Sequence, residues 1–312
     1  MPFRATFDCL WCGTAHAARG PDDLEGWAQL CPDCVGKAGD NGFLRFRLRQ
    51  ALAERSAAAR SEDAPAAPAA TTTTVAVATP EPAAAAETAD MIAYYEARAP
   101  EYDDWYLRRG RYARGAIHDA AWNAELDAAG RWLDAVPFAG ELVELAAGTG
   151  WWSTLLASKG ELSLYDTSPA ALDRARERLV AHGLRAHLHL RDVWAEPDRV
   201  VDGVFAGFWL SHVERERLPD FLALVRRWLR PGGRFAFIDS LPDPASSAAD
   251  HPPPAGDHAR RRLDDGREFT IVKVFRDAGG YADALRAAGF EDVETSETGR
   301  FFVLGSASAP GA

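Results

Sequence analysis

Alternating strand and helix signals between residues 141 and 239 constrain the fold of this chain more than any other feature. Five short apolar runs are separated by helix-like stretches, with turn-forming residues at the changes. Strands that alternate with helices favour a parallel sheet that carries helices on both faces. We therefore predict a doubly wound α/β fold. Its strands are expected at 141–146, 161–165, 186–191, 202–209 and 233–239, and its helices at 151–159, 168–182 and 214–230.

Residues that favour helix ends and turns support these boundaries. Ser168 followed by Pro169 is a typical helix opening, since serine caps the first amide groups and proline suits the first helical position. The Pro-Gly-Gly sequence at 231–233 predicts a helix stop before the fifth strand. Beyond that strand we expect a strand at 268–275, a short helix at 279–288 and a terminal antiparallel hairpin formed by 290–297 and 300–304.

The amino-acid composition divides the chain into three segments. Residues 1–60 contain all four cysteines and end in a stretch that favours a helix. Residues 61–89 are rich in alanine, proline and threonine and contain almost no large apolar side chain. Such a segment cannot bury enough apolar surface to offset the entropy of ordering, so we predict a disordered linker there. Dense apolar periodicity resumes at residue 90, and we expect the main domain to span 90–312.

The four cysteines form two matched pairs. Cys9 and Cys12 are separated by two residues, as are Cys31 and Cys34, and eighteen residues lie between the pairs. This spacing is typical of structural zinc sites, in which four thiolates complete a closed tetrahedral shell. We therefore predict a small N-terminal zinc ribbon with a following helix over 1–60, stabilised by the metal because the segment is too small for a sufficient core. A redox role for either pair is the alternative interpretation.

The charge of the chain argues against nucleic acid as its main partner. The net charge is −11, whereas residues 1–60 contain eight basic and seven acidic residues, so the excess negative charge lies in the remainder. Proteins that bind nucleic acid draw much of their affinity from neutralising phosphates. The sequence also contains no uninterrupted run of about 18 apolar residues, as a membrane helix requires, and its first residues lack a secretory signal. We therefore expect a cytoplasmic protein without membrane association.

A glycine bend follows the first predicted strand. In a doubly wound sheet, ligands bind beyond the carboxyl ends of the strands, and glycine lets the backbone approach them closely. Gly148-Thr149-Gly150 has this position, although a tight turn without a ligand is the alternative. Asp166 ends the second strand, where a carboxylate can accept both hydrogens of a ribose diol. Asp192 ends the third strand, where it either faces an adenine or caps a loop. Together these features predict a ligand that contains adenosine.

Several stretches of the main domain resemble a known family. They read ELVELAAGTGWWS, LYDTSPAAL, RDVWAEP and VDGVFAGFWLSHV, the last followed by FLALVRRWLRPGGRFAFIDS. From about residue 90 to 305 the chain resembles the class I S-adenosylmethionine (SAM)-dependent methyltransferases, chiefly those that act on small molecules. The resemblance implies a seven-stranded sheet of order 3-2-1-4-5-7-6 in which strand 7 is antiparallel. Ala146 stands where the family motif has its first glycine.

The resemblance also assigns residues to parts of the cofactor. It implies that Glu144 and the backbone of the glycine bend contact the methionine moiety, that Asp166 contacts the ribose, and that Asp192 contacts the adenine. The full set of expected cofactor-binding residues is Glu144, Ala146, Gly148, Thr149, Gly150, Asp166, Thr167, Asp192, Val193, Phe208 and Tyr95. A nicotinamide-binding fold is disfavoured, because Ser153 stands where its fingerprint requires a third glycine.

An aromatic segment precedes the first strand of the main domain. Residues 94–112 contain five tyrosines and one tryptophan. The resemblance implies that this segment forms a lid over the cofactor, with Tyr95, Tyr102 and Tyr106 as the expected contacts. An amphipathic helix that packs its aromatic side chains on the sheet is the alternative.

The chemistry of methyl transfer suggests where to look for a base. The reaction is an in-line displacement at a sulfonium carbon, so the protein chiefly positions the acceptor and excludes water. A base is required only when the acceptor atom carries a proton. His212, just after the fourth strand, is the first candidate because histidine titrates near neutral pH, and Tyr102 is the second. A hydrogen bond between His212 and its own loop is the alternative.

A long segment between residues 240 and 275 is rich in proline, serine and aspartate. Its position beyond the fifth strand predicts a mobile cover over the substrate. Its basic residues, which either meet an acidic acceptor or lie on the solvated surface, are Arg260, Arg261, Arg262 and Lys273.

These observations predict a SAM-dependent methyltransferase that methylates a small molecule on oxygen, nitrogen or carbon. Two alternatives stay open: an RNA methyltransferase guided by the zinc ribbon, and an adaptor that binds the cofactor without turnover. SAM and a structural zinc ion are the predicted cofactors, and the ribbon is the expected site for a protein partner.

Overall fold

The computed structural model describes residues 6–8, 15–17 and 82–311 of the chain. The chain divides into two units, residues 1–78 and 79–312, which are described separately. In the first unit, β1 (Thr6–Asp8) and β2 (Ala15–Ala17) form an antiparallel pair. The predicted zinc ligands lie outside the described residues, and so does the predicted linker up to residue 81. These ligands are Cys9, Cys12, Cys31 and Cys34.

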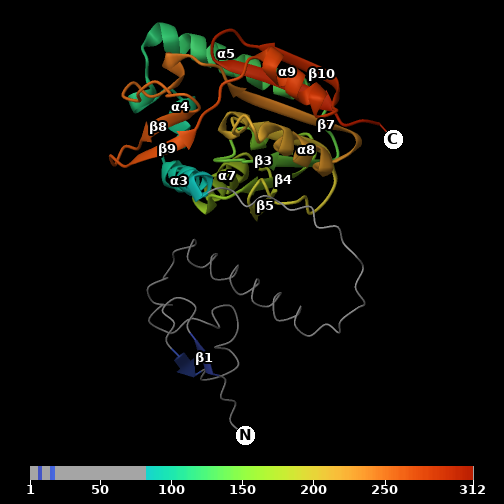
Figure 1. Cartoon of the computed structure of the whole chain (residues 1–312), viewed down its shortest axis with the longest axis horizontal. Helices are drawn as coiled ribbons and strands as arrows, with labels where there is room; N and C mark the ends of the chain where they lie inside the picture. Colours follow the sequence, from blue (N-terminus) through green and yellow to red (C-terminus); the bar gives the residue numbers. More distant parts are fainter. Residues whose placement is uncertain (1–5, 9–14, 18–81, 312) are drawn as a thin grey trace. The chain divides into compact units, whose positions relative to one another are not determined.

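A seven-stranded sheet forms the centre of the second unit (Figure 1). Its strands are β3 (Glu141–Leu145), β4 (Glu161–Asp166), β5 (His187–Leu190), β6 (Val201–Gly207), β7 (Leu229–Ser240), β10 (Glu291–Glu297) and β11 (Phe302–Ser308). They lie in the order β10-β11-β7-β6-β3-β4-β5. The strands from β7 to β5 are parallel, whereas β11 is antiparallel to both β7 and β10. The predicted α/β fold with a mostly parallel seven-stranded sheet and an antiparallel terminal pair is thus confirmed.

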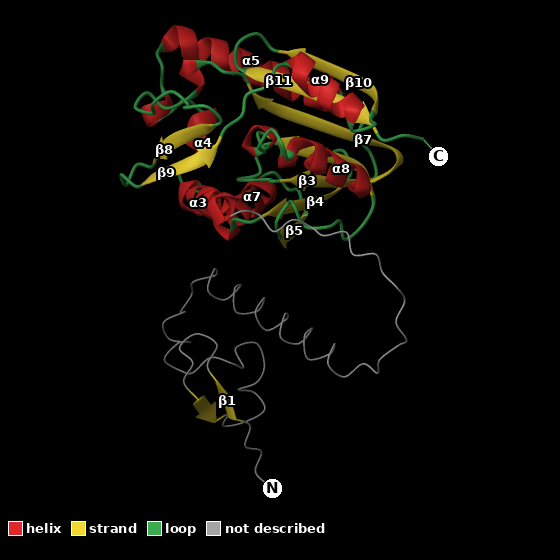
Figure 2. Cartoon of the chain, in the orientation of Figure 1, coloured by secondary structure: helices red, strands yellow, loops and turns green. Residues whose placement is uncertain are grey.

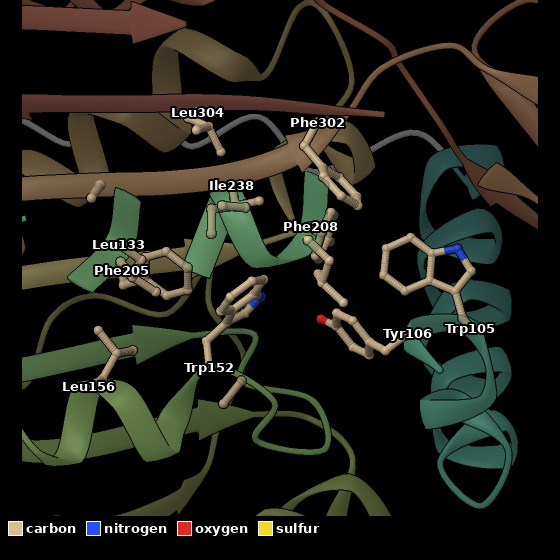
Figure 3. Packing of buried hydrophobic residues seen from close by; sticks show 14 of the residues in the cluster. Trp105, Tyr106, Leu133, Trp152, Leu156, Phe205, Phe208, Ile238, Phe302 and Leu304 are labelled. Carbon is tan, nitrogen blue, oxygen red and sulfur yellow. The ribbon is translucent and has the colours of Figure 1, made fainter. Parts of the chain in front are cut away.

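Helices cover both faces of this sheet (Figure 2). Because side chains alternate between the faces of a strand, Ala236 and Ile238 of β7 belong to one buried cluster, whereas Phe235 and Phe237 belong to another. The first cluster, part of which is shown in Figure 3, includes side chains of α5 (Ala116–Ala135), α6 (Ser153–Ala157) and α7 (Pro169–Ala181). The second includes side chains of α8 (Leu218–Trp228) and α9 (Ala278–Ala287).

The start of α7 follows the predicted capping chemistry. Ser168 Oγ accepts a hydrogen bond from the Ala171 amide at 3.0 Å, and Pro169 occupies the first helical position. Other boundaries differ from prediction. β7 begins at Leu229, so the Pro-Gly-Gly sequence lies within its first residues rather than before the strand, and the register of β7 against β6 shifts there. The helix α5 had not been predicted.

The helix α3 (Pro82–Arg98) corrects the predicted extent of the linker. It begins inside the segment assigned to the linker, so that residues 82–89 are helical. Alanine has the highest helix propensity and proline suits the first helical position, which explains why this alanine-rich stretch continues a helix whose later turns are packed. The chain continues through α4 (Tyr102–Tyr106) and a short 3₁₀ turn, η2 (Gly110–Tyr112), into α5.

A second hairpin lies beside α3, away from the main sheet (Figure 1). It consists of β8 (His258–Arg262) and β9 (Glu268–Val272), paired antiparallel. The segment predicted as a mobile cover therefore contains regular structure. Two further 3₁₀ turns, η3 (Leu210–His212) and η4 (Pro244–Ser246), follow β6 and β7. No helix among the described residues has both the length and the apolar character to cross a membrane.

Candidate active site

A cavity of about 1010 Å³, including its open mouth, lies beyond the carboxyl ends of the parallel strands. Its lining includes Tyr95 and Met91 of α3, together with Trp194 and Phe208. We call it the first cavity. Most of the residues expected to bind the cofactor line it: Ala146, Gly148, Thr149, Asp166, Thr167, Asp192, Val193, Phe208 and Tyr95. Tyr102 and His212, the two predicted catalytic residues, line it as well.

The glycine bend has the backbone that a close ligand requires. Ala146, Gly148 and Gly150 all have positive φ angles, of 53°, 55° and 74°. A Cβ on Gly148 would meet no atom within 4 Å, so the backbone there is open to a ligand. A Cβ on Gly150 would lie 2.8 Å from the Cβ of Ala175. Gly150 therefore allows α7 to pack closely, and it does not line the cavity.

Asp166 is held at the cavity by backbone amides. Its Oδ2 accepts a hydrogen bond from the Gly148 amide, and its Oδ1 accepts one from the Ser168 amide, both at 2.8 Å. Burial raises the pKa of Asp166, while these hydrogen bonds oppose the rise. At the end of the next strand, Asp192 Oδ1 accepts from the Trp194 amide at 2.9 Å, so this carboxylate both caps its loop and lines the cavity.

Glu144 does not line the cavity, contrary to expectation. Its side chain is buried beneath the glycine bend, where Oε2 accepts a hydrogen bond from Ser153 Oγ at 2.5 Å. Burial raises the pKa of Glu144 to about 8. The side chain points to the same face of the sheet as Leu142, because residues two apart in a strand share a face. A contact with the methionine moiety through this carboxylate is therefore not supported by its position.

Tyr95 and His212 form a hydrogen-bonded pair at the end of the first cavity. His212 Nδ1 lies 2.7 Å from the carbonyl oxygen of Val272, which can only accept, so Nδ1 carries the proton. His212 Nε2 therefore accepts the hydrogen bond from the Tyr95 hydroxyl at 2.7 Å. Burial and the neighbouring Lys273 hold the pKa of His212 well below its usual range. The imidazole is therefore neutral, and the lone pair on its Nε2 accepts the hydrogen bond from the Tyr95 hydroxyl.

A second cavity, of about 510 Å³ including its mouth, adjoins the first. Four side chains line both cavities and are called the partition here: Tyr95, Tyr102, Phe208 and His212. Phe208 has a φ of 57°, which is rare for a bulky residue and is often found at functional sites. Its amide donates to Ile238 O at 2.7 Å, and its ring meets that of Trp105 at 4.8 Å (Figure 3).

Three arginine and lysine side chains line the second cavity, besides His212 and His251: Arg98, Arg261 and Lys273. Arg261 and Lys273 belong to the four basic residues that the sequence places either against an acidic acceptor or on the solvated surface. Arg260 and Arg262 are instead exposed, and Arg260 pairs with Glu268. Arg98 was missed, since it lies on α3, far in sequence from the other two.

The aromatic segment contributes to the site through two of its three predicted contacts. Tyr95 and Tyr102 line both cavities, whereas Tyr106 is buried and stacks on Trp151 with ring centres 4.1 Å apart.

Asp103 of α4 accepts a hydrogen bond from Thr149 Oγ1 at 2.7 Å and another from Arg178. These bonds connect α4 to the glycine bend.

Within residues 82–311, no group of three or more His, Cys, Asp or Glu side chains is arranged to hold a metal ion.

Comparisons with known proteins agree with this geometry. Residues 142–233 match the methyltransferase domain family. The chain is 30% identical over 196 residues to the ubiquinone/menaquinone biosynthesis C-methyltransferase UbiE of Dinoroseobacter shibae, a match that covers 58% of this chain and 76% of that protein. The solved structure of the DhpI–SAH complex is 31% identical, with a TM-score of 0.57, and the match covers 72% of this chain and 97% of that one. The DhpI–SAM–HEP complex is 29% identical with the same TM-score, covering 71% and 97%.

Proposed function

Because the chain belongs to the class I SAM-dependent methyltransferases, we propose that it transfers the methyl group of SAM to a small-molecule acceptor held at the partition. The observation that carries the proposal is the pair of adjoining cavities that share four side chains. One cavity has the size and residues for the cofactor, and the other offers separate space for an acceptor. Oxygen, nitrogen and carbon all remain candidates for the methylated atom.

The residues of the first cavity fit SAM. Asp166 presents a carboxylate for the ribose hydroxyls, and the open face of Gly148 leaves room for the amino-acid part. Apolar side chains such as Val193 and Trp194 suit the adenine, with Asp192 at its edge. When bound, SAM supplies an activated methyl group: the acceptor's lone pair forms the new bond to the methyl carbon as the carbon–sulfur bond breaks and its electron pair passes to sulfur.

The partition provides orientation and a path for a proton. Phe208 and Tyr102 limit where an acceptor can lie, which holds the reacting atoms in line and excludes water. If the acceptor atom carries a proton, the Tyr95 hydroxyl can take it while passing its own proton to His212 Nε2. In this proposal His212 acts as a base through Tyr95. An acceptor without such a proton needs only the positioning.

The test of cofactor binding is the substitution Asp166→Ala. Loss of the carboxylate removes charged hydrogen bonds to the ribose, so we expect affinity for S-adenosylhomocysteine (SAH) to fall by about 30- to 100-fold. Calorimetry of the full chain measures the affinity, and circular dichroism checks the fold. Asp173→Ala, on the exposed side of α7, is the matched control and should bind normally. An unchanged affinity in Asp166→Ala would remove the assignment of the first cavity to SAM.

The class of acceptor is tested separately. We expect that a cell extract incubated with methyl-labelled SAM and this protein yields a labelled compound of low molecular mass. Label in RNA would support the ribbon-guided RNA methyltransferase instead. Binding of SAH without label in any product would support the adaptor that has no turnover.

The four cysteines retain their predicted role as part of this proposal. We propose that Cys9, Cys12, Cys31 and Cys34 bind one structural zinc ion, on the strength of their spacing alone. The ribbon so formed is the proposed site for a protein partner, and a cytoplasmic location remains a prediction.

A further inference from the structure

We propose that the second cavity binds an anionic group of the acceptor through Arg98, Arg261 and Lys273, so that the substrate is a small organic carboxylate or phosphate. This inference rests on the proposed methyl transfer and specifies its substrate class. The anionic group would lie on the far side of the partition from the first cavity, and the methyl-accepting end would reach the partition.

The three cations are buried without ionic partners. Arg98, Arg261 and Lys273 are only 7%, 8% and 8% exposed. Within residues 82–311, no salt bridge joins any of them to a carboxylate. Burying an unpaired charge is strongly unfavourable, and buried cations in proteins are normally paired. Three of them in one cavity point to a ligand of opposite charge.

Their existing contacts are neutral. Arg261 donates to the carbonyl oxygen of Arg260 at 3.1 Å, and Lys273 Nζ donates to Ser211 Oγ at 2.7 Å. The Arg98 guanidinium lies 4.5 Å from the centre of the Tyr102 ring and 5.6 Å from that of Tyr112. Such contacts accommodate a cation but do not neutralise it.

Two carboxylates whose charges interact with these cations, Asp239 and Glu101, have other hydrogen-bond partners. Asp239 is fully buried, and its two oxygens accept hydrogen bonds from the amides of Ser211 and Ser240. Glu101 Oε2 accepts from the Asp264 amide at 3.0 Å. With both of these carboxylates charged, their two negative charges would not balance three cations. Burial lowers the pKa of Lys273 to about 8; the charge of Asp239 opposes this lowering, and the charges of Arg261 and Arg98 add to it.

Unused hydrogen-bond donors complete the cavity. Within the described part of the chain, the hydroxyls of Tyr94 and Tyr112 and the Nε of Arg98 are buried without a hydrogen-bond partner. All three residues line the second cavity. Buried polar groups are nearly always satisfied, so a cluster of unsatisfied donors beside three cations fits an oxygen-rich anion.

The experiment compares the thermal unfolding of the full chain in sodium chloride, sodium acetate and inorganic phosphate at equal ionic strength and pH 7. Acetate represents a carboxylate and phosphate represents a phosphate group. We expect at least one of them to raise the unfolding temperature above that in chloride. Phosphate also stabilises many proteins non-specifically, so the variants decide the outcome.

Two variants remove a cation at nearly constant size, Lys273→Met and Arg261→Met. Because each cation is buried unpaired, both variants should unfold at an equal or higher temperature than wild type in chloride. Both should lose most of the response to the anion, with an affinity by calorimetry weaker by about tenfold or more. Arg260→Met is the matched control. Arg260 precedes Arg261 in β8 and is exposed, so this variant should respond to the anions like wild type.

Three results would overturn the inference: no anion response in wild type, an undiminished response in both variants, or loss of stability in chloride on removing a cation. The last result would mean that the cations serve the fold. SAH binding, measured on the same proteins, separates this inference from the proposed function. Wild type that binds SAH but ignores both anions refutes only the anion site, whereas failure to bind SAH refutes the methyltransferase proposal itself.

Discussion

Two residues at the site adopt a left-handed backbone that glycine adopts more easily. Ala146 has a φ of 53° and Phe208 one of 57°. For a residue with a side chain this conformation costs about 1–2 kcal/mol. In the family that the chain resembles, glycine occupies the position of Ala146. The alanine therefore adopts, at some cost, a backbone conformation that glycine adopts without strain. At Phe208 the same conformation places the aromatic ring between the two cavities, where the ring forms part of the partition.

Glu144 gives a prediction about pH at the same scale. Its pKa in the folded protein is about 8, above its usual 4.5, because of burial. The folded state therefore keeps a proton that the unfolded chain has released. The resulting stability is fully present below about pH 4.5 and is lost as the pH rises to about 8, by at most about 5 kcal/mol.

Glu144→Gln should remove this dependence. The variant is expected to match wild type near pH 5 and to be more stable by up to a few kcal/mol, on the order of 2–5, at pH 9. Urea unfolding at both pH values measures the difference. Glu177→Gln, on the exposed face of α7, should leave the wild-type pH dependence in place. A variant that tracks wild type at both pH values would contradict the raised pKa.

The position of Glu144 also shows how far motif reasoning reaches at this scale. The Gly148 bend and Asp166 could be predicted, because a backbone turn and a strand end are local properties of the sequence. The burial of the Glu144 side chain could not be predicted, since it depends on which face of β3 is covered by α6. Arg98 could not be identified for a related reason: α3 lies beside β9 only in the folded chain, and the two elements are more than 150 residues apart in sequence.

At the scale of elements, α3 connects two parts of the site. Asp90 accepts a hydrogen bond from the Thr270 amide of β9 at 2.9 Å. Glu96 accepts from Ser168 Oγ and from the Ala170 amide at the start of α7, where a negative charge is also favoured by the helix dipole. The helix thus holds the β8–β9 hairpin and the start of α7 together, and its Tyr95 lines both cavities.

Glu96→Ala should weaken this connection. Loss of the hydrogen bonds to α7 is expected to lower the free energy of unfolding by about 1–2 kcal/mol. SAH affinity should fall as well, because α3 forms one wall of the first cavity. Urea unfolding and calorimetry measure the two effects, and Glu177→Ala is the matched control on α7. If the variant kept both wild-type stability and affinity, α3 would not be fixed through Glu96.

Element boundaries could be predicted only where local signals were strong. The strands of the central sheet and the opening of α7 follow from apolar periodicity and from Ser168 with Pro169. The start of α3 could not be predicted, because an alanine-rich sequence suits both a disordered linker and a helix. Packing of Met91 and Tyr94 further along the same helix decides between them. The strand β9 lies within the strand predicted at 268–275, whereas its partner β8 was not predicted, because the sequence HARRR is mostly polar and basic.

At the scale of the whole molecule, the charge of the arginine and lysine side chains in the second cavity is opposite in sign to the net charge of the chain. The chain has a net charge of −11, yet the second cavity contains three cations. An anionic acceptor is therefore attracted by the cavity at short range and repelled by the whole molecule at long range. Added salt screens the long-range repulsion first, whereas RNA binding would weaken steeply as salt rises.

The two units of the chain lead to one prediction about their independence. Cys31→Ser removes one of the four proposed zinc ligands, so we expect the chain to lose about one zinc ion and the structure of its N-terminal segment. SAH binding should be unchanged, because the cofactor residues all lie in residues 79–312. Elemental analysis measures the zinc, and calorimetry measures the binding. Full zinc retention would contradict the ribbon, and loss of SAH binding would show that the two units depend on each other.

The unpaired cations of the second cavity have a consequence for the life of the protein in a cell. Among the residues that the structure describes, the three buried cations form no salt bridge, so the protein is less stable without the proposed acceptor, and binding of that acceptor makes unfolding rarer by mass action. Proteases act on the unfolded form, so the idle enzyme is degraded sooner than the occupied one. Its abundance would then rise and fall with the supply of its own substrate, without any dedicated regulator.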